Sequence, residues 1–481
     1  MMLRPSLLAA VFLLCAAPVL MFLAVLVPTG EIPDEVAHVV RMESLLHGNL
    51  IGYRGERPDL AGNTVPDAGV TANAGLLAAG FSFHPGTPLA ERVLDRAARD
   101  RLLQLPWAPA QSFVSIPNTA VYPPLFYVPG AVAIGLARLA DANPYAAIIG
   151  ARLVNAALYL ALGLAALLLA RRGRAMLLAT LLLPISLWLA ASCNADGLII
   201  ATAVLAAALL TRQRWTSWWG AALCVAAIIM AKPTYVPLVL PVAALMPLSG
   251  AQWAARALAC AGTALPGVAW YVLAQLRAAV PFVRGAPFQA GPYWPGDPND
   301  IFTVVDPALQ VRVLLHQPWL MVLLPVQTLW ANAKWYGLEI VGILGILDIV
   351  LPYGLYLLWF AALAGAVLAA LVDRGEPGDP GDRTRPAGPV ARLAVLAGIV
   401  AAVFALFDGQ YLSWTHTGAT VVEGVQGRYF VPLLPFLMLV PPALLRGPAA
   451  VRAVLQAPLV LAGLAGLMLL PALVVWTYYL R

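Results

Sequence analysis

The chain alternates long apolar runs with polar connections, and the lengths of these runs are the first guide to its structure. A helix that crosses the hydrocarbon core of a bilayer needs roughly 20 apolar residues. Shorter apolar runs fill the intervals between the long ones, so the pattern predicts an all-α, polytopic membrane protein of about 11 to 13 transmembrane helices. The long runs are residues 6 to 28, 146 to 170, 254 to 275, 350 to 372, 391 to 412 and 453 to 478.

Three polar segments interrupt the apolar pattern, within what we expect to be a single integral membrane domain covering residues 1–481. Residues 29–145 form the first loop, residues 276–317 the second and residues 373–390 the third. Loops as long as the first are usually functional when they belong to a compact protein. The first loop is therefore the first place to look for chemistry.

The first loop is predicted to carry juxtamembrane helices. Pro33 is followed by Asp34, a residue type that caps helix N-termini well, so a short helix is predicted from Glu35 to about His47. A second, amphipathic helix is expected from Ala90 to Leu105. Residues 122–140 contain three prolines in their first half, which favours a juxtamembrane or re-entrant helix over a regular span.

The composition fits a membrane location. Hydrophobic residues make up 61% of the chain, charged residues only 11%, and the mean hydropathy is +0.82. The net charge of +6 does not indicate a nucleic-acid partner, because the Lys and Arg residues occur in small clusters between apolar runs. The four cysteines lie in or beside apolar runs without paired spacing, so neither a disulfide framework nor a zinc site is expected.

The basic clusters predict the topology, because short cytoplasmic loops are enriched in Lys and Arg. If residues 122–140 do not cross and the N-terminus is cytoplasmic, the basic clusters fall in the cytoplasm, provided that residues 319–349 re-enter or cross an even number of times. The first loop then faces the periplasm of a bacterial inner membrane. The clusters are Arg171–Arg174, Arg212–Arg214, Arg374–Arg392 and Arg446–Arg452.

Titratable side chains gather where the first apolar run meets the first loop. Asp34 and Glu35 are adjacent carboxylates, and His38 and Arg41 follow Asp34 at helical spacing on one face. A simpler interpretation is also open: Asp34 is only a helix cap, Glu35 a favourable charge at the helix N-terminus, and the other two a solvated surface.

Further polar residues lie near the ends of later apolar runs, and the predicted topology places them on the same side as Asp34. Ionisable groups near membrane depth are costly and are functional candidates by default, although any one of them can be a helix cap. We expect them to converge on one cavity. They are Asn194, Asp196, Lys232, Tyr235, Asp348, Arg428 and Tyr429.

Several motifs together resemble a bacterial family of predicted multi-pass membrane proteins of unknown function. That family is in turn similar to the GT-C superfamily of membrane glycosyltransferases. The acidic pair in the first loop and the late Gly-Arg-Tyr sequence are the most specific parts. The motifs are Pro33–Glu35 with His38, Tyr122–Tyr127, Gly150–Asn155, Ser192–Asp196, Lys232–Pro233, Gly342–Asp348 and Val425–Pro432.

The GT-C resemblance implies a glycosyltransferase that uses a polyprenyl-phosphate-linked sugar and modifies an envelope glycan, lipid or protein. Asp34 is then the candidate general base, with Glu35 its neighbour in the acidic pair. Cationic groups would stabilise the departing phosphate, Arg by bidentate contact and Lys as a point charge. The candidate substrate and phosphate contacts are His38, Arg41, Tyr122, Arg152, Asn194, Asp196, Lys232, Tyr235, Asp348, Arg428 and Tyr429.

Two alternatives stay open at this point. No cofactor is expected, but the carboxylates of Asp34 and Glu35 could instead hold a divalent metal ion beside the phosphate. The same charged cavity could also belong to a transporter or flippase of a lipid-linked saccharide. The chain departs from oligosaccharyltransferases in lacking a Trp-Trp-Asp acceptor motif.

Overall fold

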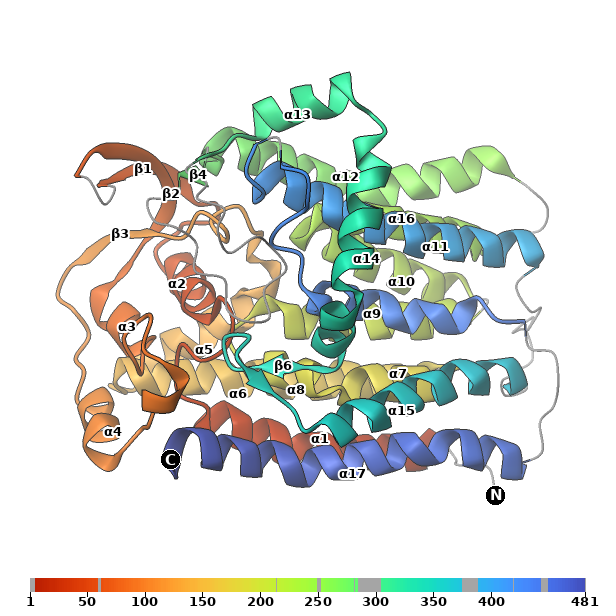
Figure 1. The fold of residues 1–481 in the computed structure, drawn as a ribbon, viewed down its shortest axis with the longest axis horizontal. Helices are drawn as coiled ribbons and strands as arrows, with labels where there is room; N and C mark the ends of the chain where they lie inside the picture. Colours follow the sequence, from red (N-terminus) through yellow and green to blue (C-terminus); the bar gives the residue numbers. More distant parts are fainter. Residues whose placement is uncertain are drawn as a thin grey trace.

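Long helices with similar directions form the body of the molecule (Figure 1). The computed structural model describes residues 5–58, 62–212, 214–248, 252–280, 282–283, 304–373, 388–417, 419–442 and 449–480. Within these ranges six helices are long and apolar enough to cross a membrane, and they coincide with the six long apolar runs of the sequence. They are α1 (Pro5–Leu26), α6 (Pro144–Leu169), α12 (Trp253–Ala278), α15 (Tyr353–Val372), α16 (Pro389–Ser413) and α17 (Ala449–Tyr479).

Two bent helix pairs raise the number of candidate spans to eight. The helices α8 (Pro184–Ala190) and α9 (Ala195–Leu210) meet at 119°, and α13 (Pro307–His316) and α14 (Leu320–Val341) meet at 105°. The larger number predicted from the sequence requires shorter apolar helices to cross as well, and it stays a prediction. These are α5 (Val128–Leu139), α10 (Trp215–Ala231), the 3₁₀ helix η3 (Pro233–Leu238) with α11 (Val239–Ala244), and the 3₁₀ helix η4 (Gly427–Leu439).

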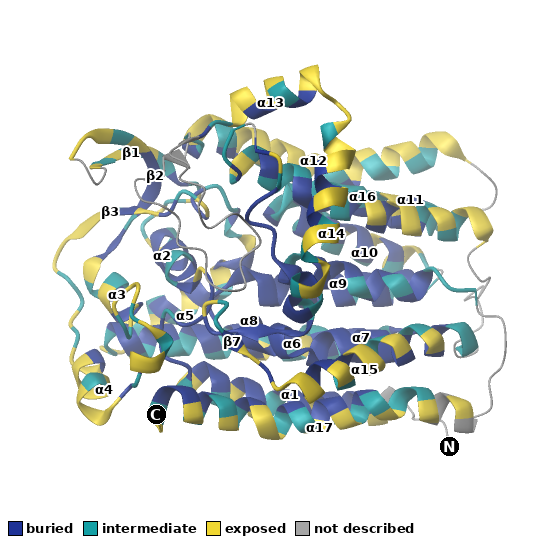
Figure 2. Ribbon diagram, in the orientation of Figure 1, coloured by how far each residue is buried: buried dark blue, intermediate teal, exposed yellow. Residues whose placement is uncertain are grey.

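The centre of the bundle consists of α7 (Arg174–Leu182), α8 and α9, which are almost entirely buried (Figure 2). Their sequences are apolar on all sides, as expected for helices that are surrounded by protein. The helices α1, α6, α15 and α17 pack on one side of this centre, and α10 and η4 on the other, with α16 packed on η4.

The first loop contains a β-sheet, so the all-α prediction needs correction: the fold is mostly helical with a small sheet. Strands β1 (Tyr53–Pro58), β2 (Thr64–Asn73) and β3 (Gln111–Ser115) pair antiparallel in that order. The pairing of β2 with β3 joins residues far apart in the chain, which no local pattern reveals. Two short strand pairs also occur, β4 (Phe282–Val283) with β5 (Val304–Val305) and β6 (Ile343–Leu344) with β7 (Ile349–Val350).

The first loop contains helices close to the two positions that the sequence predicts. The helix α2 (Glu35–Leu45) begins at the expected residue, while the helix expected from Ala90 to Leu105 is divided into η1 (Leu89–Glu91) and α4 (Arg96–Leu103). The remaining short elements of this region are α3 (Ala74–Ala79) and η2 (Pro124–Phe126). Residues 284–303 of the second loop, 374–387 of the third and 443–448 lie outside the described residues.

The first loop and the basic turn Arg171–Arg174 lie at opposite ends of the bundle (Figure 1). Arg171 N donates to Thr211 Oγ1 at 2.9 Å and Gly173 N donates to Asp373 Oδ2 at 2.8 Å, which joins three turns at one end. The N-terminus lies at this same end, whereas the sheet and α2 lie at the other. The helix α14 runs across the bundle, unlike the long helices.

This arrangement predicts that the two ends are labelled from opposite sides of the membrane. Glu56→Cys in β1 and Gln252→Cys before α12 both place a thiol at an exposed position. In intact cells a membrane-impermeant maleimide should label one variant, and the other should react only after the cells are opened. The wild-type chain, with four cysteines in apolar segments, is the control. Labelling of both variants in intact cells would contradict the arrangement.

Candidate functional site

Four charged side chains alternate in sign at the end of the bundle that carries the first loop. The Arg428 Nη2 atom donates to Asp34 Oδ2 at 2.6 Å, and the Arg428 Nε atom lies 3.7 Å from Asp196 Oδ2. Lys232 Nζ in turn lies 2.5 Å from Asp196 Oδ1. We call Asp34, Arg428, Asp196 and Lys232 the charge cluster.

The charge cluster is open to its surroundings mainly at Asp34. The Asp34 side chain is 41% exposed, whereas those of Arg428, Asp196 and Lys232 are 2%, 10% and 13% exposed. Among the described residues the Arg428 Nη1 atom has no hydrogen-bond partner although it is buried. A buried guanidinium with an unused donor is a site at which an anionic oxygen can bind.

Aromatic side chains border the two cations. The ring of Tyr429 lies 4.5 Å from Lys232 Nζ and 5.3 Å from Arg428 Cζ, within the range of cation–π contacts. Tyr235 donates its hydroxyl proton to the Tyr429 carbonyl oxygen at 2.8 Å, which fixes the backbone there. Burial raises the pKa of Tyr122, and the negative charge of Asp196 beside it raises this pKa further.

The break between α8 and α9 positions the acidic half of the cluster. Asn194 caps α9 by accepting a hydrogen bond from Asp196 N at 2.8 Å. A Cβ atom at Gly197 would lie 2.6 Å from Ala190 Cα, so only glycine permits the close return of the chain. Asn194 Nδ2 also donates to the Pro33 carbonyl oxygen at 2.9 Å, which ties this break to the residue before Asp34.

Asp34 occupies the N-cap position of α2, as the sequence predicts, but its side chain does not cap the helix. Its φ is 61°, a left-handed conformation, and its side chain makes no capping hydrogen bond. The carboxylate points instead to Arg428, which belongs to η4 and lies far along the chain. A non-glycine residue in this conformation is uncommon and is typical of positions that the surrounding structure holds in place.

The predicted acidic pair separates in the structure. Glu35 accepts hydrogen bonds from Arg152 Nε at 2.7 Å and Nη2 at 2.5 Å, and both side chains are buried. Asp34 therefore belongs to the charge cluster, and Glu35 to a separate buried pair. Within the described ranges no group of three or more His, Cys, Asp or Glu residues is arranged to hold a metal ion.

His38 and Arg41 bind protein groups. The Nδ1 atom of His38 shares a hydrogen bond of 2.7 Å with the Tyr127 hydroxyl group. Arg41 donates to the carbonyl oxygens of Tyr122 at 3.0 Å and Asn49 at 2.7 Å, and also to that of Leu50. These contacts hold the polypeptide around the site.

Asp348 lies in a second cluster, and the three other members of this cluster were not among the predicted residues. Arg92 Nη1 lies 2.8 Å from Asp348 Oδ2 and 3.0 Å from Glu31 Oε2. Tyr478 donates its hydroxyl proton to the same Glu31 oxygen at 3.0 Å. Arg92 is one of many charged residues in the polar loop, so its burial had no signal in the sequence.

Glu339 is a further residue that the sequence reasoning missed. It accepts a hydrogen bond from Gly427 N at 2.5 Å, directly before Arg428, and its second carboxylate oxygen has no hydrogen-bond partner in the described parts of the chain. A single acid inside the apolar run of α14 was the available signal.

Comparisons with known proteins identify the class of this chain. Residues 18–437 match the family described as "Predicted membrane protein (DUF2142)". The chain belongs to this family of predicted membrane proteins. No curated protein and no solved structure matches the chain.

Breaking the Glu35–Arg152 pair should destabilise the protein strongly, since removal of one partner leaves a buried charge uncompensated. Arg152→Met should lower the free energy of unfolding by about 3–5 kcal/mol. The double variant Glu35→Gln with Arg152→Met should recover part of this loss. Unfolding of the purified protein in detergent measures both effects.

Arg96→Gln is the control for this experiment, because Arg96 pairs with Asp100 at 3.9 Å on an exposed surface. Exposed pairs contribute little, so its transition should stay close to that of the wild-type protein. An Arg152→Met protein as stable as Arg96→Gln would contradict the assignment.

His38 should make the folded protein sensitive to acid. Burial lowers the pKa of His38 from 6.5 to about 4, although the neighbouring charges of Asp34 and Asp196 oppose this shift. The His38 imidazole is therefore protonated near pH 6.5 in the unfolded chain, but only near pH 4 in the folded protein. Stability is fully present above pH 6.5 and falls as the pH is lowered toward 4, by up to about 1.4 kcal/mol per pH unit.

The comparison of His38→Gln with His84→Gln, at an exposed position, measures this contribution. Between pH 7 and pH 5 the thermal midpoint of His38→Gln should fall less than those of the wild-type protein and of His84→Gln. Equal slopes for all three proteins would argue against a buried neutral imidazole.

Proposed function

We propose that this protein is a membrane glycosyltransferase that transfers a sugar from a polyprenyl-phosphate-linked donor to a glycan, lipid or protein acceptor. The observation that carries the proposal is the 2.6 Å contact between Arg428 and Asp34. It joins the two groups that this chemistry requires, an acid to accept a proton and a cation to bind the leaving phosphate. The GT-C resemblance of the sequence motifs supports the same reaction.

The donor phosphate would bind to the buried cations of the charge cluster. Arg428 offers its unused Nη1 donor, and Lys232 adds a second positive charge on the other side of Asp196. Both would stabilise the negative charge that develops on the phosphate oxygen as its bond to the sugar breaks.

Binding of the phosphate would also activate Asp34. While Asp34 is paired with Arg428, the cation stabilises the carboxylate and makes it a weak base. A phosphate that takes over the guanidinium of Arg428 weakens this pairing. Asp34, the most exposed member of the cluster, then accepts the proton of the acceptor hydroxyl while the acceptor oxygen bonds to the sugar and the lipid phosphate leaves.

We further propose that this reaction takes place at the periplasmic face of a bacterial inner membrane. The basic turn Arg171–Arg174 lies at the end of the bundle opposite the charge cluster, and basic turns favour the cytoplasm. In a GT-C-like arrangement of about 11 to 13 spans the shorter apolar helices would cross as well. Glu35 and Arg152 would then support the site by holding Asp34 in place.

Asp34→Asn should abolish transfer, because an amide cannot accept the proton. The rate should fall by about 100-fold or more. The measurement is mass spectrometry of envelope glycans in cells that carry each variant at equal expression. Glu56→Gln, at an exposed position of the same loop, is the matched control and should retain activity.

Full activity of Asp34→Asn would overturn the general-base role. A second measurement follows the lipid donor in detergent, since a transferase releases free polyprenyl phosphate and a flippase leaves every covalent bond of its cargo intact. Movement of the intact lipid-linked sugar between the leaflets of proteoliposomes, without release of lipid phosphate, would replace the proposal by transport.

A further inference from the structure

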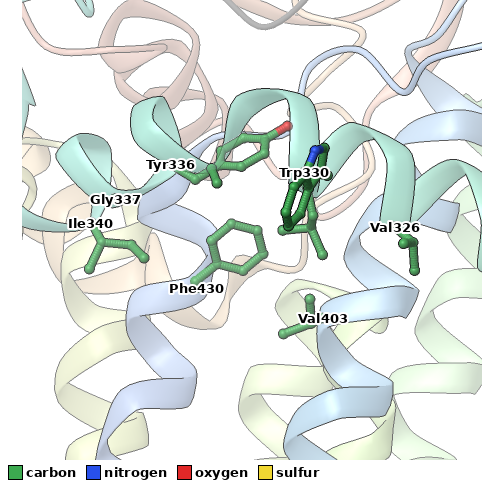
Figure 3. Close-up of a pocket in the computed structure, with 9 residues that line it drawn as sticks. Val326, Trp330, Tyr336, Gly337, Ile340, Val403 and Phe430 are labelled. Carbon is green, nitrogen blue, oxygen red and sulfur yellow. The ribbon is translucent and has the colours of Figure 1, made fainter.

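A cavity lies under the helix α14, on the side of η4 that carries Phe430. Its volume is about 520 Å³, and three elements line it (Figure 3). The lining residues are Val326, Leu329, Trp330, Ala333, Tyr336, Gly337 and Ile340 of α14, Val403 of α16 and Phe430 of η4.

The lining is suited to hydrocarbon. Apart from the Tyr336 hydroxyl group and the Trp330 indole nitrogen, the side chains are aliphatic or aromatic carbon. Figure 3 shows Tyr336, Trp330, Phe430 and Val403 around one space. A water molecule needs several polar partners to occupy a cavity, which these side chains do not provide.

The cavity opens on a surface that suits contact with lipid. Trp330 is 87% exposed, and Val326 and Met321 on the same helix are 48% and 44% exposed. Large exposed apolar side chains in a chain with this hydropathy are expected to face the bilayer. A lipid chain can therefore reach the cavity from the membrane.

The cavity is joined to the charge cluster through η4. Phe430, which lines the cavity, comes two residues after Arg428, and the intervening Tyr429 contacts both cations of the cluster. The Phe430 ring lies 5.6 Å from the Tyr336 ring. A Cβ atom at Gly427 would lie 2.6 Å from the Tyr336 carbonyl oxygen, so the start of η4 packs directly on α14.

We propose that this cavity holds the first part of the hydrocarbon chain of an isoprenoid phosphate whose phosphate group binds Arg428. The inference rests on the proposed function for the identity of the lipid. It adds the position of the lipid's hydrocarbon chain. The anion site at Arg428 and the apolar cavity share the short segment η4. Together they fit a ligand that has both an anionic group and a hydrocarbon chain. A ligand that lacks the phosphate would contact only the cavity. A ligand that lacks the hydrocarbon chain would contact only the cations.

Ala333→Trp tests the proposal, because Ala333 lines the cavity and an indole would fill it. Ala331→Trp is the matched control, since Ala331 is an exposed residue of the same helix outside the lining. The probes are farnesyl phosphate, hexadecyl phosphate, farnesol and methyl phosphate. Their binding to the purified full-length protein in detergent is measured by calorimetry or by competition.

We expect Ala333→Trp to weaken farnesyl phosphate about tenfold or more, through loss of buried hydrocarbon contact, and to leave methyl phosphate unchanged. Ala331→Trp should bind every probe as the wild-type protein does. Arg428→Gln should weaken both phosphates, and farnesol should bind more weakly than farnesyl phosphate.

Unchanged farnesyl phosphate binding in Ala333→Trp, or equal losses in both Trp variants, would overturn the proposal. Tighter binding of hexadecyl phosphate than of farnesyl phosphate would assign the cavity to acyl chains instead. Since no sugar is transferred in these measurements, their outcome is independent of the Asp34→Asn assay, which tests the reaction alone.

Discussion

The buried pair between Glu35 and Arg152 is the constraint on which the rest of the site depends. Arg152, on α6, also donates to the carbonyl oxygens of Val27 at 2.6 Å and Pro28 at 3.2 Å, at the end of α1. Glu35 accepts a third hydrogen bond from Cys193 N at 3.1 Å, in the break before α9. One ion pair thus joins two long helices and a helix break to the first residue of α2. Charges buried this deeply are tolerated only with such complete hydrogen bonding.

Because Glu35 is fixed, its neighbour Asp34 has little freedom. Glu35 points into the bundle toward Arg152, whereas Asp34, with its left-handed backbone, directs its carboxylate to the more exposed side. Arg428, in η4, pairs with the Asp34 carboxylate on that side. The neutral balance of the charge cluster, two acids and two bases, lets Arg428 stay charged at low exposure. An incoming anion must therefore compete with a carboxylate for Arg428. Of the two carboxylates, that of Asp34 is the more exposed to solvent.

The sequence allowed the long helices, the start of α2 and the convergence of residues 34, 196, 232 and 428 to be predicted. Each of these depends on hydropathy over many residues, or on a charge in an apolar context, which are local signals. The separation of Asp34 from Glu35 could not be predicted, because it depends on which distant cation each one meets. The pairing of β2 with β3 and the cluster around Arg92 were missed for the same reason, because each joins residues far apart in the chain.

The 3₁₀ form of η4 explains how one short segment serves both a polar and an apolar neighbour. With 3.0 residues per turn, residues three apart lie on one side of such a helix. Gly427 and Phe430 therefore share a side, and both contact α14, at Glu339 and Tyr336. Arg428 lies on the next side, toward Asp34 and Asp196. Pro432 and Pro435 lie within the segment, where they remove backbone donors from the regular α-helical pattern.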